Sequence, residues 1–312
     1  MSKLNFNPST DIPSLSGKIL LVTGGTAGLG RETILNLIKH EPARIYFSGR
    51  SQASANKLIA EAQETHPSVP VSFIQADLTS MASIKAAATD FLSHETRLDI
   101  LFANAGIMAH PPGLTKDGYE IQFGTNHMGH AALVKLLLPI LQRTAETTGD
   151  ARIIWNTSLG YKAASTIQFD RLKSPNSYPS PIGVMGEWLR YGQSKLANLL
   201  YARAFAQRYP TITSVAVHPG VSYTGLVESL GLFNRMFVYA TTARTNISSE
   251  ECAFNQQWAA TAVKAKGERA VESGVYYEPV GVEGELTKAG ADDNLATKLW
   301  DWTQKELAEH GI

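Results

Sequence analysis

The chain has 312 residues, of which 44% are apolar and 18% are charged, and its 28 basic residues balance its 28 acidic ones. This length allows a sizeable core in one large or two small domains, and the zero net charge gives no support for a nucleic-acid or acidic-membrane partner. Cys252 is the one cysteine, which excludes an internal disulfide and favours a reducing, cytoplasmic location. No apolar run approaches about 18 residues, so no membrane span is expected.

Short apolar runs alternate with helical patterns along the chain. Strands are predicted at 18–23, 44–48, 69–75, 98–103, 152–157, 213–217 and 275–277. Helices are predicted at about 28–40, 54–65, 80–93, 119–142 and 188–208. Most strands are apolar on both faces, which indicates a mostly parallel sheet sandwiched between helices. We therefore expect an α/β, doubly wound, seven-stranded fold in one domain, 1–312.

Two stretches lack a regular pattern. Residues 159–187 are rich in Pro and Ser, and residues 221–249 are apolar and aromatic. Both are interpreted as insertions on the rim of one domain and not as linkers between domains.

The first strand runs into a glycine-rich turn, Thr23-Gly-Gly-Thr-Ala-Gly-Leu-Gly30, which opens a helix. Glycines let the backbone approach a pyrophosphate, and the helix N-terminus supplies N–H groups and positive partial charge. A tight turn that uses glycine for backbone reasons alone is the alternative. The strand–turn–helix context favours dinucleotide binding.

Cofactor preference is read at the end of the second strand, where an acid would bind the ribose hydroxyls of NAD. This chain has Ser48-Gly49-Arg50-Ser51 and no acid there. Arg50 could pair with a 2′-phosphate, which favours NADP(H), although a solvated loop arginine would look the same.

Tyr191 and Lys195 lie four residues apart, on one face of a predicted helix. A phenol has an unperturbed pKa of about 10, and a cation held close to it lowers that pKa. The pair could therefore be an acid–base centre, although the spacing alone is common.

Four motifs in order extend this picture: Thr-Gly-x-x-x-Gly-x-Gly, Asn104-Ala-Gly106, Tyr191-x-x-x-Lys195 and Pro219-Gly220. Together they resemble the short-chain dehydrogenase/reductase family in its compact branch, with a Rossmann fold. Asn126-His-Met-Gly-His130 and the sequence after Tyr191 are most similar to retinol-dehydrogenase-like and fungal members.

The resemblance assigns cofactor contacts from the glycine turn to the nicotinamide end. Asp77 would contact the adenine, Asn104 the sheet and the adenosine ribose, and Thr224 the nicotinamide amide or phosphate. Ala27 stands where NADP-preferring members often have a basic or polar residue. The full expected set is Gly24, Thr26, Ala27, Gly28, Leu29, Gly30, Arg50, Ser51, Asp77, Leu78, Asn104, Ala105, Gly106, Tyr191, Lys195, Pro219, Gly220, Val221 and Thr224.

The resemblance also implies four catalytic residues. Tyr191 would be the acid or base, and Lys195 would lower its pKa and hold the nicotinamide ribose. Ser158 would donate to the substrate oxygen, with Thr157 as the fallback if the register slips by one. Asn126 would position a water for proton relay.

Other polar residues are given structural roles. His127, His130 and His218 show no ligand spacing with carboxylates, so no metal is expected and packing or hydrogen-bonding roles are favoured. Cys252 is expected in the core, and Trp188 lines either the substrate mouth or the core.

Ser158 and Tyr191 are 33 residues apart, more than the family usually has. The insertion 159–187 must therefore loop out, and we expect it to form one wall of the substrate mouth. The stretch 221–249 is expected to be a substrate lid, with a structural helix pair as the alternative.

The predicted function is NADP(H)-dependent hydride transfer between the nicotinamide and a ketone, aldehyde or secondary alcohol of a bulky apolar small molecule. C=C or C=N reduction, or a non-catalytic NADP-binding sensor or scaffold, are the alternatives. The helices 119–142 and 188–208 are those through which many family members dimerise, so a homodimer is one expectation for the assembly.

Overall fold

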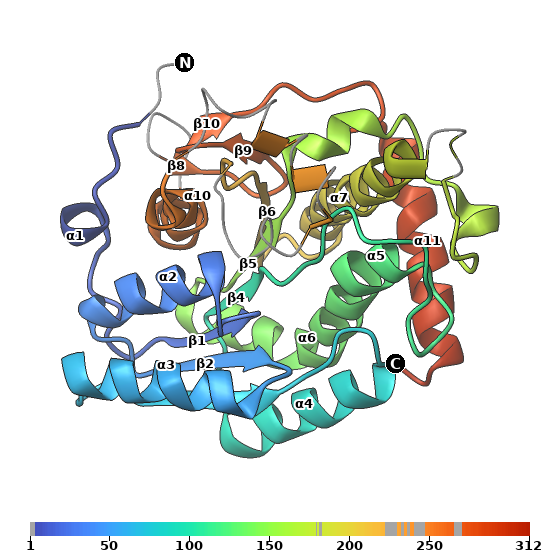
Figure 1. Cartoon of the computed structure of the whole chain (residues 1–312). Coiled ribbons are helices and arrows are strands. Elements are labelled where there is room, and N and C mark those ends of the chain that lie inside the picture. The colour runs from blue at the N-terminus through green and yellow to red at the C-terminus, as the bar shows by residue number, and fades with distance from the viewer. Residues whose placement is uncertain are drawn as a thin grey trace.

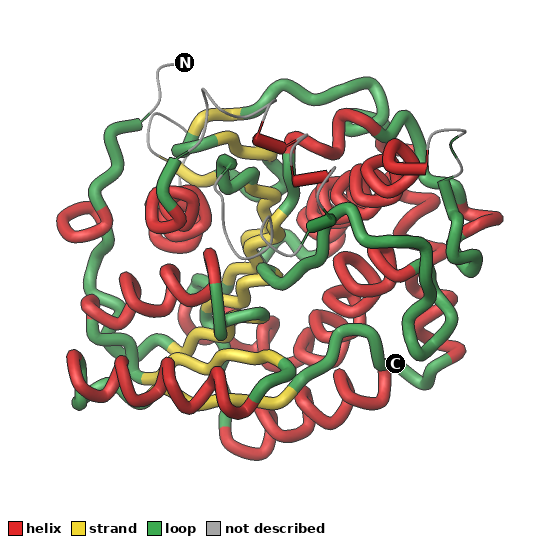
Figure 2. The backbone as a smooth tube through the Cα atoms, in the orientation of Figure 1, coloured by secondary structure: helices red, strands yellow, loops and turns green. Residues whose placement is uncertain are grey.

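The computed structural model describes residues 4–178, 180, 183–221, 230–231, 234–235, 238–239, 247–264 and 270–312. A twisted central sheet runs through the molecule, with helices on both sides (Figures 1 and 2). Its strand order is β10-β9-β6-β5-β4-β1-β2-β3, and every pair is parallel except β9 with β10. The strands are β1 Ile19–Thr23, β2 Arg44–Gly49, β3 Val71–Gln75, β4 Ile100–Ala103, β5 Arg152–Asn156, β6 Thr213–Val217, β9 Tyr276–Glu278 and β10 Val282–Glu283.

The sheet confirms the predicted doubly wound class but has eight strands, not seven. The extra strand, β10, has two residues and folds back on β9 with Val282 opposite Glu278. A strand this short carries no periodic pattern, and a tight turn rather than a crossover makes it antiparallel. A separate two-stranded sheet pairs β7 Val263–Lys264 with β8 Ala270–Val271.

Two groups of helices cover the two faces of the sheet (Figure 1). One apolar core lies beneath α2, α3 and α10, and a second lies beneath α4, α6, α7 and α11. The helices are α1 Pro8–Asp11, α2 Gly28–Leu37, η1 Ile38–His40, α3 Gln52–Thr65, α4 Met81–His94, α5 Ile121–Phe123, the π-turn η2 Gly124–Met128, α6 Gly129–Thr148, η3 Leu159–Ala163, η4 Phe169–Arg171, α7 Gly183–Arg208, α10 Ser249–Thr261 and α11 Asp293–Glu309.

Local sequence explains where several helices begin. Ser51, Ser80 and Asp292 each accept a hydrogen bond from a backbone N–H in the first turn of α3, α4 and α11. Ser248 and Glu251 form a reciprocal capping box at the start of α10.

Part of the insertion after Ser158 packs against the protein. Tyr161, Ile167 and Leu172 are buried in the core beneath α7. These apolar residues, which are spaced too irregularly to predict a helix or strand, cover one side of α7.

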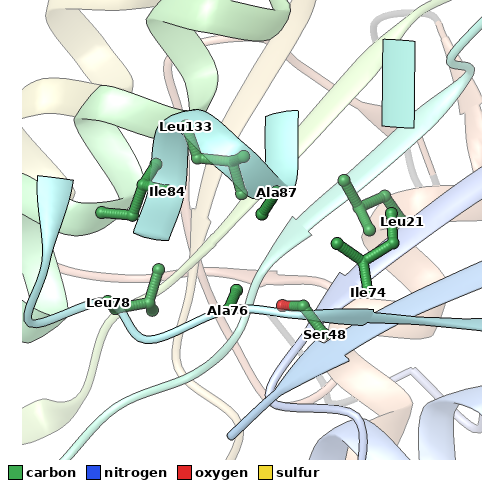
Figure 3. Close-up of a pocket in the computed structure, with 8 residues that line it drawn as sticks. All are labelled: Leu21, Ser48, Ile74, Ala76, Leu78, Ile84, Ala87 and Leu133. Carbon is green, nitrogen blue, oxygen red and sulfur yellow. The ribbon is translucent and has the colours of Figure 1, made fainter. Parts of the chain in front are cut away.

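A small apolar void of about 10 Å³ lies between the sheet and helices α4 and α6. Figure 3 shows it with Ser48 as the one polar side chain among the eight drawn. Such a void is at the lower limit for one water molecule, so it is a packing feature and not a ligand site. In the described part of the chain, no helix is both long and apolar enough to cross a membrane.

Candidate active site

The expected site residues gather at one edge of the sheet. Thr23, Gly49, Asn104 and Asn156 stand at or just after the carboxyl ends of β1, β2, β4 and β5, and Pro219 follows β6. In an open parallel sheet, ligands bind in the crevice outside these ends. The strand order places β1 beside β4, which is the point where the winding direction reverses.

The glycine turn is packed closely against the Asn104–Gly106 segment. Gly24 has φ +67°, and a Cβ there would lie 2.9 Å from the Cβ of Ala105. Only glycine combines this backbone conformation with so close a neighbour. Ala27 precedes α2 and has no side chain that could cap it, so the first-turn N–H groups are suited to a phosphate.

Asn104 is tied to both neighbouring strands. Its amide nitrogen donates to the Thr23 carbonyl at 2.8 Å, and its oxygen accepts from Asn156 Nδ2 at 2.9 Å. Asn156 also donates to Gln256 of α10 at 2.7 Å. The amide of Asn104 therefore supports the sheet, as the family resemblance implied.

Residues expected at the adenosine end lie around β2 and β3. Arg50 is exposed, and Gly49 lies against Thr26, since a Cβ on Gly49 would be 3.1 Å from Thr26 Cγ2. The Asp77 carboxylate accepts from Thr79 and from Lys116 Nζ, the latter at 2.9 Å. These partners lower the pKa of Asp77 although its partial burial opposes them, so the carboxylate is held ionised and oriented.

At the nicotinamide end, Gly220 has φ +97° and Val221 accepts from the Ile247 N–H. Asn255 of α10 donates to the carbonyl of His218, directly before Pro219. Thr224 and most of the expected lid 221–249 lie outside the described residues.

The side chains of Ser158, Tyr191 and Lys195 meet despite the long insertion. The Ser158 hydroxyl accepts from the Gly160 N–H at 3.1 Å. A Cβ on Gly160 would lie 3.4 Å from Ser158 Oγ and 3.0 Å from Tyr191 Cε1, so both side chains lie against this glycine. Lys195 Nζ lies 5.8 Å from the centre of the Tyr191 ring and donates to the Asn156 carbonyl at 3.1 Å. Thr157, the fallback for Ser158, points away and donates to the Lys195 carbonyl.

Burial governs the protonation of this pair. It raises the pKa of Tyr191 to about 12, while the hydrogen bond from Ser158 acts in the opposite direction. Burial also lowers the pKa of Lys195 to about 8. In the chain by itself the pKa of Tyr191 is therefore shifted upward overall, because desolvation of the phenol dominates.

Asn126 lies in the π-turn and is fully buried. Its side chain accepts from the Ile107 N–H at 2.8 Å and donates to the Ile107 carbonyl and to Ser194 Oγ. A Cβ on Gly106 would lie 3.1 Å from Asn126 Oδ1 and 3.3 Å from Lys195 Nζ. Asn126 is thus brought beside Lys195, with its amide committed to the protein.

The three residues between Tyr191 and Lys195 each make a close contact or a hydrogen bond. A Cβ on Gly192 would come within 2.6 Å of the Gly160 carbonyl, so this position permits the insertion to approach α7. Gln193 accepts from the Gln168 N–H and donates to Ser177, both in the insertion. Ser194 donates to the Tyr191 carbonyl.

Trp188 packs beside Tyr191 on α7. Its ring meets that of Tyr191 edge-on at 6.1 Å, and it packs with Met108, Ala109, Leu230 and Val238. Its indole N–H donates to Asn234 at 3.0 Å. Trp188 therefore joins α7 to described parts of the 221–249 stretch.

The buried histidines were predicted to have structural roles, and they do make internal contacts. His127 bonds Thr303 of α11, whereas His130 bonds Thr23 and the Asn126 carbonyl. The described residues contain no group of three or more metal-ligating side chains. Sequence reasoning missed the contact of His130 with Thr23, although its spacing of four from Asn126 was a usable signal.

The fold and this arrangement of residues define a nicotinamide-dependent oxidoreductase scaffold, and comparison with known proteins agrees. The family model "short chain dehydrogenase" matches residues 18–165. The chain belongs to the short-chain dehydrogenase/reductase family.

The chain is 35% identical over 314 residues to short-chain dehydrogenase/reductase drtF of Aspergillus calidoustus, covering 96% of this chain and 97% of that protein. It is 33% identical to human retinol dehydrogenase 14, covering 92% of this chain and 85% of the relative. Among solved structures, the NADPH-bound carbonyl reductase from chicken fatty liver matches with a TM-score of 0.64 at 20% identity, covering 89% of this chain and 98% of that one. This last likeness concerns the fold.

Proposed function

We propose that the chain is an NADP(H)-dependent carbonyl reductase or alcohol dehydrogenase acting on a bulky apolar small molecule. The observation that carries the proposal is the meeting of Ser158, Tyr191 and Lys195 at the carboxyl edge of the sheet, across 33 residues of sequence. Such an arrangement serves proton transfer to or from an oxygen.

The residues present fit a dinucleotide. Gly24 and Gly106 leave room beside Ala105 and Lys195 that a Cβ would fill. The first turn of α2 would hold the pyrophosphate, and Arg50 with the Ser51 end of α3 would hold a 2′-phosphate. When bound, the nicotinamide supplies or accepts the hydride.

The chain's own groups would handle the proton. With a pKa of about 12, Tyr191 is a neutral phenol at pH 7 and carries the proton that an alkoxide requires during reduction. Ser158 would donate a second hydrogen bond to the same oxygen. In oxidation Tyr191 would act as the base, with the positive charges of Lys195 and of the oxidised nicotinamide lowering its pKa.

Substrate preference is inferred from the apolar residues that lie beside Tyr191. Trp188, Met108 and Ala109 present an apolar wall beside Tyr191, joined by Leu230 and Val238. This wall favours an apolar or aromatic substrate. We propose that the insertion 159–187 and the stretch 221–249 complete the mouth as parts of one domain.

Turnover of NADPH with a panel of ketones and aldehydes tests the proposal. Tyr191→Phe should reduce kcat by roughly 100-fold or more, because the proton donor is lost, while NADPH binding is retained. Tyr201→Phe is the matched control: this buried tyrosine lies on the same helix, but its hydroxyl accepts from Gln304 of α11.

Full activity in Tyr191→Phe would disprove the mechanism. Tight NADPH binding without turnover of any carbonyl compound would instead favour a sensor or scaffold. Turnover restricted to activated C=C or C=N compounds would favour the corresponding reductase.

A further inference from the structure

The segment Asn104–Ile107 forms the floor between the glycine turn and Lys195, and it is held at both ends by one helix. At its far end, Asn126 bonds both the N–H and the carbonyl of Ile107. At its near end, the N–H groups of Asn104 and Ala105 donate to Thr23 Oγ1 at 2.9 and 3.0 Å. His130 reaches Thr23 from α6.

His130 lies four residues after Asn126 and has both ring nitrogens engaged. Nδ1 lies 2.8 Å from the Asn126 carbonyl, and Nε2 lies 2.9 Å from Thr23 Oγ1. The π-turn, in which the Gly129 N–H donates to the Gly124 carbonyl five residues back, sets the offset between the two residues. The imidazole is 1% exposed.

The partners fix the tautomer of His130. A carbonyl can only accept, so Nδ1 carries the proton. Burial lowers the pKa of His130 to about 4, hence Nε2 is a bare acceptor at neutral pH. The Thr23 hydroxyl accepts from the N–H groups of Asn104 and Ala105 and has one proton to donate, for which Nε2, at 2.9 Å, is the nearer acceptor. The Phe102 carbonyl, 3.1 Å away, is the competing acceptor for that proton.

We propose that His130 is a positioning residue for the cofactor site: it orients the Thr23 hydroxyl so that it holds the Asn104–Ala105 backbone, and it links this contact to Asn126. The role rests on the proposed cofactor site. Ala105 packs on Gly24, and Gly106 lies beside Lys195, so a shift of this segment would disturb both ends of the dinucleotide.

His127 provides a matched control. It is three residues away, is equally buried and also has a lowered pKa, of about 3, mainly because of burial. Its Nε2 bonds Thr303 of α11, on the side away from the glycine turn. Loss of either imidazole should reduce stability, but only loss of His130 should reduce cofactor affinity.

The test measures NADPH dissociation by its fluorescence, and KM and kcat where turnover is found. His130→Leu should weaken NADPH binding about tenfold, since it leaves buried polar groups unpaired, and should raise KM for NADPH more than it lowers kcat. His130→Asn keeps a donor near the Asn126 carbonyl and should lose less. His127→Leu should bind NADPH within about twofold of the wild type.

Substitutions at Thr23 probe the other half of the contact. Thr23→Val should weaken binding as His130→Leu does, the double variant should be no worse than either single one, and Thr23→Ser should restore affinity. Folded His130→Leu protein with wild-type affinity, or fully multiplicative effects in the double variant, would overturn the role.

If the variants do not fold, the tautomer of His130 can still be measured in the wild-type protein. Nitrogen-15 chemical shifts of His130 should show the Nδ1-protonated tautomer at pH 7, and an Nε2-protonated or charged ring would contradict the proposal. A wild-type protein that binds no dinucleotide would refute the cofactor site itself, and the role of His130 with it.

Discussion

At the scale of single residues, Arg50 is the candidate that decides between the two nicotinamide cofactors. Its side chain is exposed next to the N-terminus of α3, and no acid stands at the end of β2. Arg50→Ala should raise KM for NADPH by roughly 10- to 100-fold and leave KM for NADH nearly unchanged, because a charge-assisted bond to phosphate is lost.

Arg31→Ala is the control for this prediction. Arg31 follows the glycine turn, but its guanidinium is engaged by Glu32 and Glu61, both at 2.7 Å. Steady-state kinetics with both cofactors check the prediction, and an equal effect of Arg50→Ala on NADPH and NADH would contradict it.

The sequence motifs predicted which side chains of the site would lie close together. They did not predict how deeply each side chain would be buried or what would surround it. Ser158, Tyr191, Lys195 and Asn126 are brought together as the motifs implied. The direction of the pKa shift of Tyr191 could not be predicted, because desolvation depends on the packing of segments distant in sequence. The link between Thr23 and His130 depends on strand order, and it joins residues 107 positions apart.

At the scale of elements, the contact between the insertion and α7 depends on Gly192. Alanine is the better helix former, so Gly192→Ala would stabilise an isolated helix by about 1 kcal/mol. Here its Cβ would press on the Gly160 carbonyl, 2.6 Å away. We expect a net loss of about 1–3 kcal/mol in the free energy of unfolding, measured by urea denaturation.

Gly113→Ala serves as the control for Gly192→Ala. A Cβ there would find its nearest neighbour at 3.8 Å, on Ile121, which is ordinary van der Waals contact. Its unfolding free energy should change little. Gly192→Ala protein as stable as the wild type would show that the insertion is free to move away from α7.

Elements with strong periodicity were predictable, and elements made by tertiary contact were not. The parallel strands and α2, α3, α4 and α6 follow the apolar pattern closely. The insertion buries Tyr161 and Leu172 without any period, because its conformation is set by contacts with Gln193 and Gly192 of another element. The two-residue strand β10 is too short for a pattern to exist.

At the scale of the whole molecule, buried ionisable groups set the response to acid. Burial lowers the pKa values of His127, His130 and His218 to about 3, 4 and 3, so the unfolded chain binds these protons below about pH 6.5 and the folded chain does not. Burial raises the pKa of Glu120 to about 7, so there the folded chain binds the proton first. The unfolded state gains a net two protons.

Stability should therefore fall as the pH is lowered from about 6 to 5, by about 3 kcal/mol per pH unit. Urea denaturation at a series of pH values measures this slope. His127→Gln removes one titrating group and should reduce the slope by about half. A stability that stays level or rises over this range would contradict the assignment of neutral histidines to the folded protein.

Helix α11 packs over α7 and α6, the helices that a second copy of the chain would contact in the expected dimer. Every side chain from Arg190 to Tyr201 of α7 is buried within the single chain, and Trp300 of α11 stacks on Tyr201 at 4.8 Å. Gln304 of α11 accepts from Lys135 of α6 and donates to the Tyr201 hydroxyl. The helices through which the family resemblance implied a dimer are thus largely covered by the chain itself.

We therefore predict a monomer of 33.8 kDa at micromolar concentration. Sedimentation velocity or light scattering after size exclusion measures the mass directly. A stable dimer would show that pairing uses another surface or requires α11 to move.

The three residues inside the Tyr191–Lys195 motif make contacts with other segments of this chain. The two ends of the motif are the proposed acid–base pair, whereas Gly192 and Gln193 contact the insertion and Ser194 accepts a hydrogen bond from Asn126. Substitutions at the two ends would abolish turnover in a protein that still folds. Substitutions at the three inner positions would instead reduce the amount of folded protein in the cell. The same five residues would therefore set two separate quantities, the rate of the reaction and the amount of folded protein.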